Sequence, residues 1–507
     1  MESLVTLVLV AAFLFATVVF LRRRTITINI TPSRARRAPA PLKPRQRLIT
    51  ISDAAVAQRA LVENADAFST RPFALFGKPL ITGPERRRSD NIISAPHGRL
   101  WRALRCNLSS EVIHPTRMAS LGPLRRAAIG AVVADLRRQS TAAAKGEAAL
   151  VVRDCLYAAV FSMTARLCFG AAVDEAQVRG MQRNMQEFFL AVGPSPSKKQ
   201  PGARPTELGR GRDPAGSIRR RQVEFFLPLI EARRQSSRFC NNEGGLRLYI
   251  DSLLDLSVPD VDDDHLDVDD NGIRRRALTD DELVSLVSEF LGAGTETVVA
   301  SIEWTLAHLT TNPRVQNKLC REVSCIVDGD DSRCPSEPEE REIQMHHRSA
   351  MPYLHAVVLE SLRMHPTVPF AMRELRTESE GAVIGQTTMP EGGLRVHFSL
   401  GAIGRDSKAW TDPDEFRPER FLAGGEAEDV GPLPGPKGIR MMPFGAGPRY
   451  CPGMNLAMLN IKCFLAALVR EFQWTTQHEI SSVDLTEIDG FFKVMKNPLR
   501  ARVTPRA

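Results

Sequence analysis

The most apolar stretch of the chain lies at its N-terminus. Positions 4–21 are uncharged and strongly apolar, which is just long enough for a helix to cross a bilayer. Arg22, Arg23 and Arg24 follow at once, so the positive-inside rule keeps the C-terminal side in the cytosol. A cleaved signal peptide is the alternative, but it would have a basic start and a shorter apolar core, whereas this chain begins Met1-Glu2. We expect a membrane anchor at residues 1–21 and a basic, proline-containing linker at residues 22–47.

The apolar pattern further along the chain predicts several helices. Leu48 to Phe68 has the pattern of a short strand followed by a helix. A long helix is expected to start after Thr279 and run to Leu309, with Glu282 as the capping-box partner of Thr279. Another covers Tyr353 to Met364 and ends just before a proline, because the residue preceding a proline disfavours the helical conformation.

Two segments are predicted to be loops. Gly193 to Arg221 is rich in Pro, Gly, Lys and Arg and lacks helical periodicity. Pro259 to Arg276 begins with an acidic run and ends in three arginines, and such charge runs are usually solvated.

Composition narrows the class of protein. Apolar residues make up 43% of the 507 positions, which is ample for a large core. The nine cysteines are scattered and form no CxxC pair, a pattern that fits a reducing compartment and not a disulfide scaffold. The net charge of +8 favours a membrane surface or an acidic protein as partner, and nothing in the pattern points to nucleic acid.

The most informative chemistry is in the segment Phe444 to Gly453. Gly447 and Gly453 allow backbone angles that a side chain would forbid, so the loop can lie close to a flat ligand. Backbone N–H groups and the N-terminus of the helix that follows can hold Cys451 as a thiolate. A thiolate can serve as the axial ligand of haem iron. The alternative is a buried structural cysteine in a Gly/Pro turn.

The same segment resembles the haem-binding signature of the cytochrome P-450 superfamily, Phe-x-x-Gly-x-Arg-x-Cys-x-Gly, at every fixed position. The matching residues are Phe444, Gly447, Arg449, Cys451 and Gly453. The resemblance implies haem b (iron protoporphyrin IX) as cofactor, with Cys451 as its axial thiolate ligand.

Ala293 to Thr297 matches a second motif of that family. The small residues at 293 and 294 would let a flat group approach the helix, and Thr297 can bond back to a carbonyl one turn earlier. The resemblance implies that Glu296 and Thr297 relay protons to the reacting oxygen. The alternative is an ordinary solvent-facing pair on a helix.

Other matches concern haem carboxylates and a structural triad. Trp101 and Arg105 lie four apart on one helical face, and the resemblance implies that they hold a haem propionate together with Arg373 and Arg449. The family usually has a further basic residue where Cys106 stands.

Glu360 and Arg363, three apart, can pair on one helical face, although a lone pair of this spacing is weak evidence. The downstream Pro-Glu-Arg-Phe match adds Arg420. By the resemblance, these three residues form a buried triad that braces the cysteine loop.

The resemblance extends over residues 48 to 505 and is of the plant microsomal type, near the plant families numbered seventy-seven and eighty-nine. It implies the cytochrome P-450 fold, mainly α with a small β portion, and a haem-thiolate catalytic domain at residues 48–507. The expected reaction inserts one oxygen atom of O2 into a small lipophilic substrate, with electrons from NADPH through a membrane-bound reductase. The expected location is the endoplasmic reticulum membrane, single-pass, with the catalytic domain cytosolic and no nucleic-acid partner.

Two alternatives stay open. Thr25 to Arg47 is shorter than the hinge and first elements of such relatives, which motivates a non-catalytic or decayed haem-binding paralogue. An O2-independent, peroxide-rearranging member is the other, and the Glu296-Thr297 pair argues against it.

A reductase-docking face is expected at basic residues near the cysteine loop, namely Arg99, Arg102, Lys437, Arg440 and Lys462.

Overall fold

The structure is a computed structural model of the chain. It describes residues 47–72, 91–143, 149–171, 173–192, 214–236, 247–260, 275–327, 350–375, 394–476, 483–488 and 490–506. The predicted anchor and all of the predicted linker except residue 47 lie outside the described residues.

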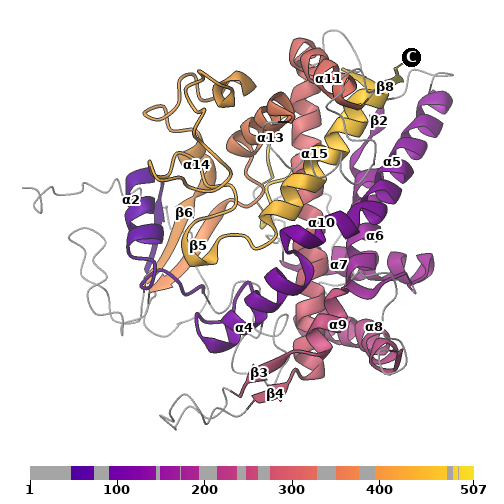
Figure 1. Cartoon of the computed structure of the whole chain (residues 1–507), viewed down its shortest axis with the longest axis vertical. Helices are drawn as coiled ribbons and strands as arrows, with labels where there is room; N and C mark the ends of the chain where they lie inside the picture. Colours follow the sequence, from indigo (N-terminus) through magenta and orange to yellow (C-terminus); the bar gives the residue numbers. More distant parts are fainter. Residues whose placement is uncertain are drawn as a thin grey trace, which may run out of the picture.

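Helices make up most of the described residues (Figure 1). They are α2 (Ala54–Gln58), α4 (Arg99–Asn107), α5 (Gly122–Ala143), α6 (Arg153–Phe169), α7 (Glu175–Val192), α8 (Pro214–Ser236), α9 (Tyr249–Leu254), α10 (Asp280–Thr311), α11 (Pro313–Val327), α13 (Pro352–Met364), α14 (Leu400–Gly404) and α15 (Met454–Glu471).

The long helix α10 runs through the middle of the helical part (Figure 1). Its predicted N-cap is confirmed, because the Glu282 N–H donates to Thr279 Oγ1 at 3.4 Å and the Thr279 N–H donates to Glu282 Oε2 at 2.7 Å. Among the described residues, α10 is also the one helix long and apolar enough to cross a membrane. Most of it is buried against α6, α13 and α15, so it is the central core helix of the domain.

Within the described residues, the strands form three separate sheets. In the first, β1 (Arg47–Ile51) pairs in parallel with β6 (Leu394–Ser399), which pairs antiparallel with β5 (Phe370–Leu375). This sheet lies beside α2, away from the helical part (Figure 1). The others are β2-β8-β7 and β3-β4, with bounds β2 (Leu150–Val151), β3 (Ser257–Pro259), β4 (Arg275–Ala277), β7 (Phe472–Thr475) and β8 (Arg500–Pro505).

The prediction of a loop at residues 193–221 is partly wrong. Helix α8 begins at Pro214, so residues 214–221 of the predicted 193–221 loop are helical, and residues 193–213 lie outside the described part. The three consecutive arginines at 219–221 made this segment resemble a charged loop. The buried positions Ile218, Gln222, Phe226 and Ile230, spaced four residues apart, were therefore not recognised as one face of a helix. That repeat faces the protein interior on one side of the helix, where α8 packs against α7 and α10.

The ends of the other predicted loop pair with each other. Ser257–Pro259 and Arg275–Ala277 form the antiparallel strands β3 and β4, while residues 261–274 lie outside the described part. The predicted strand and helix at Leu48 to Phe68 are confirmed by β1 and α2.

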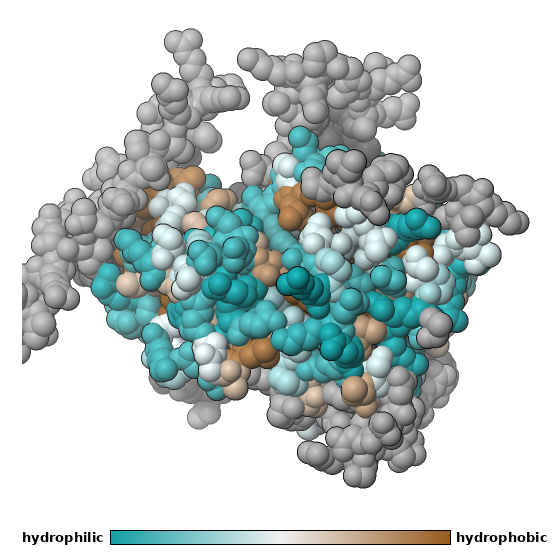
Figure 2. All heavy atoms as spheres, turned by 90° about the horizontal axis from the view of Figure 1, so that it is seen from above, coloured by the Kyte–Doolittle hydropathy of each residue, from teal (hydrophilic) through white to brown (hydrophobic). Residues whose placement is uncertain are grey.

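The view from above shows a mostly hydrophilic described surface with hydrophobic residues in small groups (Figure 2). The large hydrophobic side chains that are exposed in the described part are Leu48, Val62, Tyr450 and Ile488. The buried apolar residues of the described part mainly form one large core around α6, α10, α13 and α15 and a second, smaller cluster between α2 and the β1-β6-β5 sheet.

Candidate active site

The loop Phe444–Gly453 has a shape that depends on glycine. Gly445 and Gly447 have φ angles of 76° and 67°, which side chains rarely adopt. A Cβ at Gly447 would stand 2.0 Å from the carbonyl oxygen of Leu61. The Cys451 N–H donates to the Phe444 carbonyl at 2.8 Å and closes the turn. The backbone of the loop therefore fixes where Cys451 stands.

The Cys451 thiol faces a cavity, and the groups around it influence its charge state. Burial raises the pKa of this thiol, while a hydrogen bond from the Gly453 N–H and the charges of Arg105 and Arg71 act in the opposite direction. Helix α15 starts directly after Gly453, so its N-terminus also favours an anionic sulfur. These groups suit a sulfur that is to bind a metal ion as thiolate.

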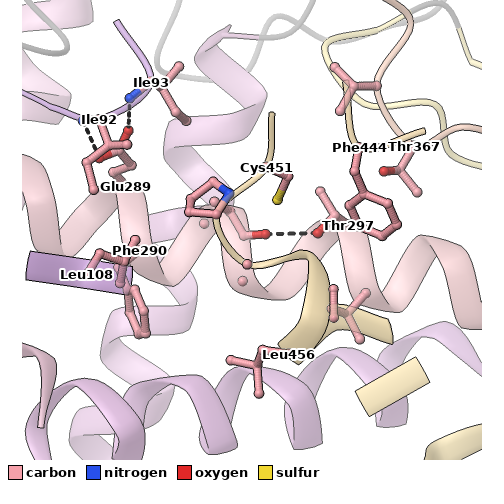
Figure 3. Close-up of a pocket in the computed structure, with 18 of the residues that line it drawn as sticks. Ile92, Ile93, Leu108, Glu289, Phe290, Thr297, Thr367, Phe444, Cys451 and Leu456 are labelled. Atoms are coloured by element: carbon pink, nitrogen blue, oxygen red, sulfur yellow. Dashed lines mark hydrogen bonds between the residues drawn. The ribbon is translucent and has the colours of Figure 1, made fainter. Parts of the chain in front are cut away.

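The cavity lies between the cysteine loop and α10 (Figure 3). The side chains of Cys451 and Thr297 both line it, from the loop and from α10. Most other lining groups are apolar; among them are Leu108, Phe290, Val298, Phe444, Leu456 and Phe492. A flat apolar ligand above the sulfur would therefore meet α10 on its other face.

Thr297 has the geometry that the sequence predicted. Its Oγ1 donates to the Ala293 carbonyl at 2.9 Å, one turn earlier on α10 (Figure 3). Gly294 has a further role that the sequence did not reveal, since a Cβ there would stand 3.1 Å from Thr164 Cγ2 on α6. The small residue at 294 therefore permits close packing of α6 against α10 as well as access to the cavity.

Glu296 does not line the cavity. It is buried beside α6, where it is ion-paired with Arg153, and Arg153 also contacts Glu303 Oε2 at 2.6 Å. Burial raises the pKa of Glu296, Arg153 lowers it, and the second carboxylate, Glu303, raises it again. The net direction is upward, so this carboxyl holds a proton more readily than an exposed glutamate.

The four residues expected to hold propionates all line the same cavity. Trp101 Nε1 donates to the Ile92 carbonyl at 3.1 Å, and the Arg449 guanidinium lies 4.2 Å from the Trp101 ring centre. Arg105 also lies over Trp101, at 5.5 Å. Arg373 is fully buried, and its Nη2 donates to the Ala446 carbonyl at 3.3 Å.

Two further cavity residues were missed by the sequence analysis. Arg71 donates to the Ile93 and Arg449 carbonyls, each at 3.1 Å. Glu289 accepts hydrogen bonds from the N–H groups of Ile92 and Ile93 (Figure 3). The signal for Glu289 was its place two turns before Thr297 on the same helix, whereas Arg71 is brought to the cavity only by the fold.

The charges around the cavity fit an anionic cofactor. Among the described residues, six arginines line it, namely Arg71, Arg105, Arg125, Arg219, Arg373 and Arg449, together with one carboxyl, that of Glu289, whose pKa burial raises to about 7. Burial and the neighbouring arginines lower the pKa of Arg449 to about 9.

The same two causes lower the pKa of Arg373. Arg373 Nε is buried and has no hydrogen-bond acceptor within the described part of the chain. Two carboxylates on a ligand would offset this surplus of positive charge.

The residues of the predicted triad lie in contact and are fully buried. Arg363 Nε and Nη2 donate to the two oxygens of Glu360 at 2.7 and 2.8 Å, and Arg420 Nε donates to Glu360 Oε1 at 3.1 Å. The remaining guanidinium donors bond backbone carbonyls, among them those of Gly404 and Pro413, and Arg420 Nη1 also donates to the Glu426 carboxylate. These bonds connect α13 to the segment that precedes the cysteine loop.

The expected docking face needs one correction. Lys462 has an exposed fraction of only 1%, so its inclusion was wrong. Its side chain lies within the core beside Glu322, and burial lowers its pKa to about 8. Arg99 and Arg102 are exposed on α4, and Lys437 is exposed but ion-paired with Asp429 at 2.9 Å.

A mainly helical domain with a cysteine at the N-terminus of a core helix, facing a second core helix across an apolar, arginine-rimmed cavity, defines the class of haem-thiolate oxidoreductases. Comparison with known proteins agrees with that class. The family model for Cytochrome P450 matches residues 43–504.

Several curated plant proteins are similar over most of their length. Cytochrome P450 89A9 of Arabidopsis thaliana is 34% identical over 460 residues, which is 90% of this chain and 84% of that protein. Cytochrome P450 78A11 of rice is 31% identical over 81% of this chain and 70% of that protein. The 2-hydroxyisoflavanone synthase of Glycyrrhiza uralensis is 30% identical over 80% of this chain and 72% of that protein.

A solved zebra fish cytochrome P450 with abiraterone has a TM-score of 0.66, with 22% identity, 91% of this chain and 94% of that chain covered. The chain belongs to the cytochrome P-450 family. The predicted fold, the haem-thiolate cofactor class and the monooxygenase class of enzyme are thereby confirmed.

Proposed function

We propose that this chain is a membrane-anchored monooxygenase that inserts one oxygen atom of O2 into a small lipophilic substrate, with electrons from NADPH through a reductase. The observation that carries the proposal is the shared cavity of Cys451 and Thr297, whose walls are largely apolar. Such a cavity favours an uncharged, lipophilic substrate, because burying an unpaired polar group there would be unfavourable.

Different residues around the cavity would contact different parts of haem. Cys451 would bind the iron, and Trp101, Arg105, Arg373 and Arg449 would bond the propionates, with Arg71 as an additional cation. Phe444, Gly447 and Gly453 would shape the loop beside the ring. Haem bound through a thiolate supplies the oxygen-activating chemistry, because the thiolate donates electron density that favours O–O cleavage.

Thr297 and Glu296 would deliver protons in sequence. The Thr297 hydroxyl stands at the cavity wall, where it can orient a proton donor. The Glu296 side chain is 11% exposed beside Arg153, so it can exchange protons with solvent at the edge of α6. Its raised pKa makes it a better proton donor near neutral pH than an exposed glutamate.

The sequence and the surface charges support the proposed membrane anchor and reductase partner. The apolar run at residues 1–21 would anchor the chain in the endoplasmic reticulum membrane, with residues 48–507 as a cytosolic catalytic domain. Arg99 and Arg102 are exposed on the helix that also carries Trp101 and Arg105 at the cavity. An acidic flavoprotein would be steered to that side of the molecule.

A carbon monoxide difference spectrum on reduced microsomes tests the proposal. The full-length protein should show the band of a thiolate-bound haem, and Cys451→Ser should lose that band while the protein remains in the membrane, because a hydroxyl is a poor ligand for haem iron. A band retained by Cys451→Ser would mean that another cysteine is the ligand.

NADPH consumption separates the remaining alternatives. With a flavoprotein reductase and a lipophilic substrate, coupled consumption of NADPH and O2 is expected. A normal carbon monoxide band without any NADPH-dependent turnover would indicate a non-catalytic haem protein. Conversion of a lipid peroxide without NADPH or O2 would indicate a peroxide-rearranging enzyme.

A further inference from the structure

A buried pair of histidines lies behind the cavity, outside the site described above. His308 is on α10 and His365 directly follows α13. Their Nε2 atoms are 3.0 Å apart, and His365 Nδ1 lies 2.9 Å from Glu487 Oε1. The three side chains therefore form a continuous bridge from the core helix to the C-terminal part of the chain.

Hydrogen bonding fixes where the protons sit in this bridge. Burial would raise the pKa of Glu487, but bonds from His365 and Lys493 outweigh it and hold the pKa at about 2. The ionised carboxylate accepts from His365 Nδ1–H, so Nε2 of a neutral His365 carries a lone pair. His308 must then donate from its own Nε2–H. Both histidines thus hold a single tautomer.

The surroundings keep both rings neutral and in place. Trp304 stacks on His365 with 3.9 Å between ring centres, and Phe416 stacks on His308 at 4.3 Å. Burial lowers the pKa of both histidines, and the charges of Arg405 and Arg363 lower it further, while Glu487 opposes this at His365. Lys493, on the other side of Glu487, is the remaining cation that faces the bridge.

The far end of the bridge is attached to a hairpin of residues 484–488 and 490–497, which we call the C-terminal hairpin. Its stem is closed by Ile488 N–H to Val494 O at 2.9 Å and Lys496 N–H to Thr486 O at 2.8 Å. Lys493 Nζ contacts Glu487 Oε2 at 2.9 Å, within the same hairpin.

Two more bonds hold the hairpin to the core. The Lys493 N–H donates to the Thr367 carbonyl at 2.9 Å, and Trp304 Nε1 donates to the Lys493 carbonyl at 3.1 Å. The tip of the hairpin presents Phe491 and Phe492 to the cavity, where Phe492 packs edge-on against Phe189 of α7 at 5.2 Å.

We propose that the His308–His365–Glu487 bridge positions the C-terminal hairpin and thereby determines the size of ligand that the cavity accepts. The histidines touch neither ligand nor cofactor and act through Phe491 and Phe492. The proposal rests on the proposed function in that the cavity must hold haem and a ligand above it.

Azole binding to the full-length, haem-loaded protein tests this proposal. Imidazole is small enough to bind haem iron without reaching the hairpin, whereas clotrimazole, an imidazole with a bulky triarylmethyl group on one nitrogen, is expected to contact it. His308→Leu removes the donor to His365 and should weaken clotrimazole binding by at least about fivefold, the value of one lost hydrogen bond. Imidazole binding and the carbon monoxide band should stay within about twofold.

His308→Gln is the matched control. Its amide N–H can still donate to His365 Nε2, so clotrimazole affinity should return to the wild-type value. Should His308→Leu give little folded protein, Glu487→Gln keeps the volume and removes the charged acceptor, and it should weaken clotrimazole binding in the same selective way.

The outcomes are distinct. A normal carbon monoxide band with unchanged clotrimazole binding in His308→Leu and Glu487→Gln would overturn this inference alone. Equal losses of imidazole and clotrimazole affinity would overturn it too, by making the bridge a general brace of the fold. Absence of the band in the wild type would overturn the proposed function.

Discussion

Two buried clusters of glutamate and arginine lie on either side of the core and differ in their balance of charge. At the end of α13, the single carboxylate of Glu360 accepts from two guanidiniums, Arg363 and Arg420, and Glu426 adds a second carboxylate at Arg420. Between α6 and α10, the single guanidinium of Arg153 is shared by Glu296 and Glu303.

This difference in charge distinguishes the Glu360 cluster, which stabilises the fold, from the Glu296 cluster, which can hold a proton. In the first cluster two cations meet two anions, and the Glu360, Arg363 and Arg420 side chains are completely buried. In the second cluster two carboxylates share one cation, and burial together with the charge of Glu303 raises the Glu296 pKa against the opposing effect of Arg153. A second carboxylate beside the same cation therefore adds to the tendency of the buried Glu296 carboxyl to hold a proton.

The largest effect is expected from breaking the brace. Glu360→Ala leaves the buried Arg363 guanidinium without a carboxylate and Arg420 with Glu426 alone, which should cost on the order of 3–5 kcal/mol. Since a domain is typically stable by only about 5–15 kcal/mol, little haem-loaded protein should be recovered. The measurement is the yield of protein with the carbon monoxide band. Glu419→Ala is the matched control, because Glu419 is 46% exposed and paired with Lys318, and its loss should cost under about 1 kcal/mol.

Glu289 is a third buried carboxyl that can be compared with these two clusters, because backbone amides and not a guanidinium donate to it. The folded-state pKa of Glu289 is raised by burial from 4.5 to about 7, so the folded protein holds this proton more tightly than the unfolded chain. Its contribution to stability is complete below pH 4.5 and is lost as the pH rises through about 7, a change of about 3 kcal/mol.

Denaturant titrations across this range should show the decline in wild type and a flatter profile in Glu289→Gln. Parallel profiles of the two proteins would mean that the Glu289 carboxyl is compensated in the folded state.

Proton delivery should slow when the carboxyl of Glu296, which shares Arg153 with Glu303, is removed. Glu296→Gln keeps the shape and an acceptor for Arg153, so haem content should survive, while product formation slows at least about tenfold. More hydrogen peroxide should appear per NADPH consumed, and Thr297→Ala should act in the same direction.

Glu303→Gln is the internal control for this test, since it removes the other carboxyl of the same cluster, whereas Glu296 is the one that directly precedes Thr297 on α10. Equal uncoupling in Glu296→Gln and Glu303→Gln would show that the cluster serves structure alone.

The smallest effect is expected at the surface, where water screens charges. Reversing Arg99 and Arg102 to Glu should slow the first electron transfer from the reductase by about two- to fivefold at low salt. Lys437→Glu is the control, because that side chain is already neutralised by Asp429. Reduction rates that do not respond to salt or to the double reversal would remove α4 as part of the docking face.

The local features of the site were predictable because they depend on neighbours in sequence. The glycine-dependent turn before α15, the back-bonded Thr297 and the Thr279 capping box each involve residues within about one helical turn of one another. Helix α8 is the counterexample, since its charged residues concealed the buried four-residue repeat that packs against α7 and α10.

The sequence by itself identified the candidate ligand cysteine, the family and several helices, among them α10 and α13, because those features depend on short-range patterns. Only the tertiary structure decided that Glu296 faces α6 instead of the cavity, that Arg71 joins the arginines around it, and that Lys462 is buried. In each case the deciding contact joins positions far apart in the chain, such as Arg153 with Glu296 or Arg71 with Arg449. The direction in which a side chain points is set by the helix packed against it, and no local pattern encodes that choice.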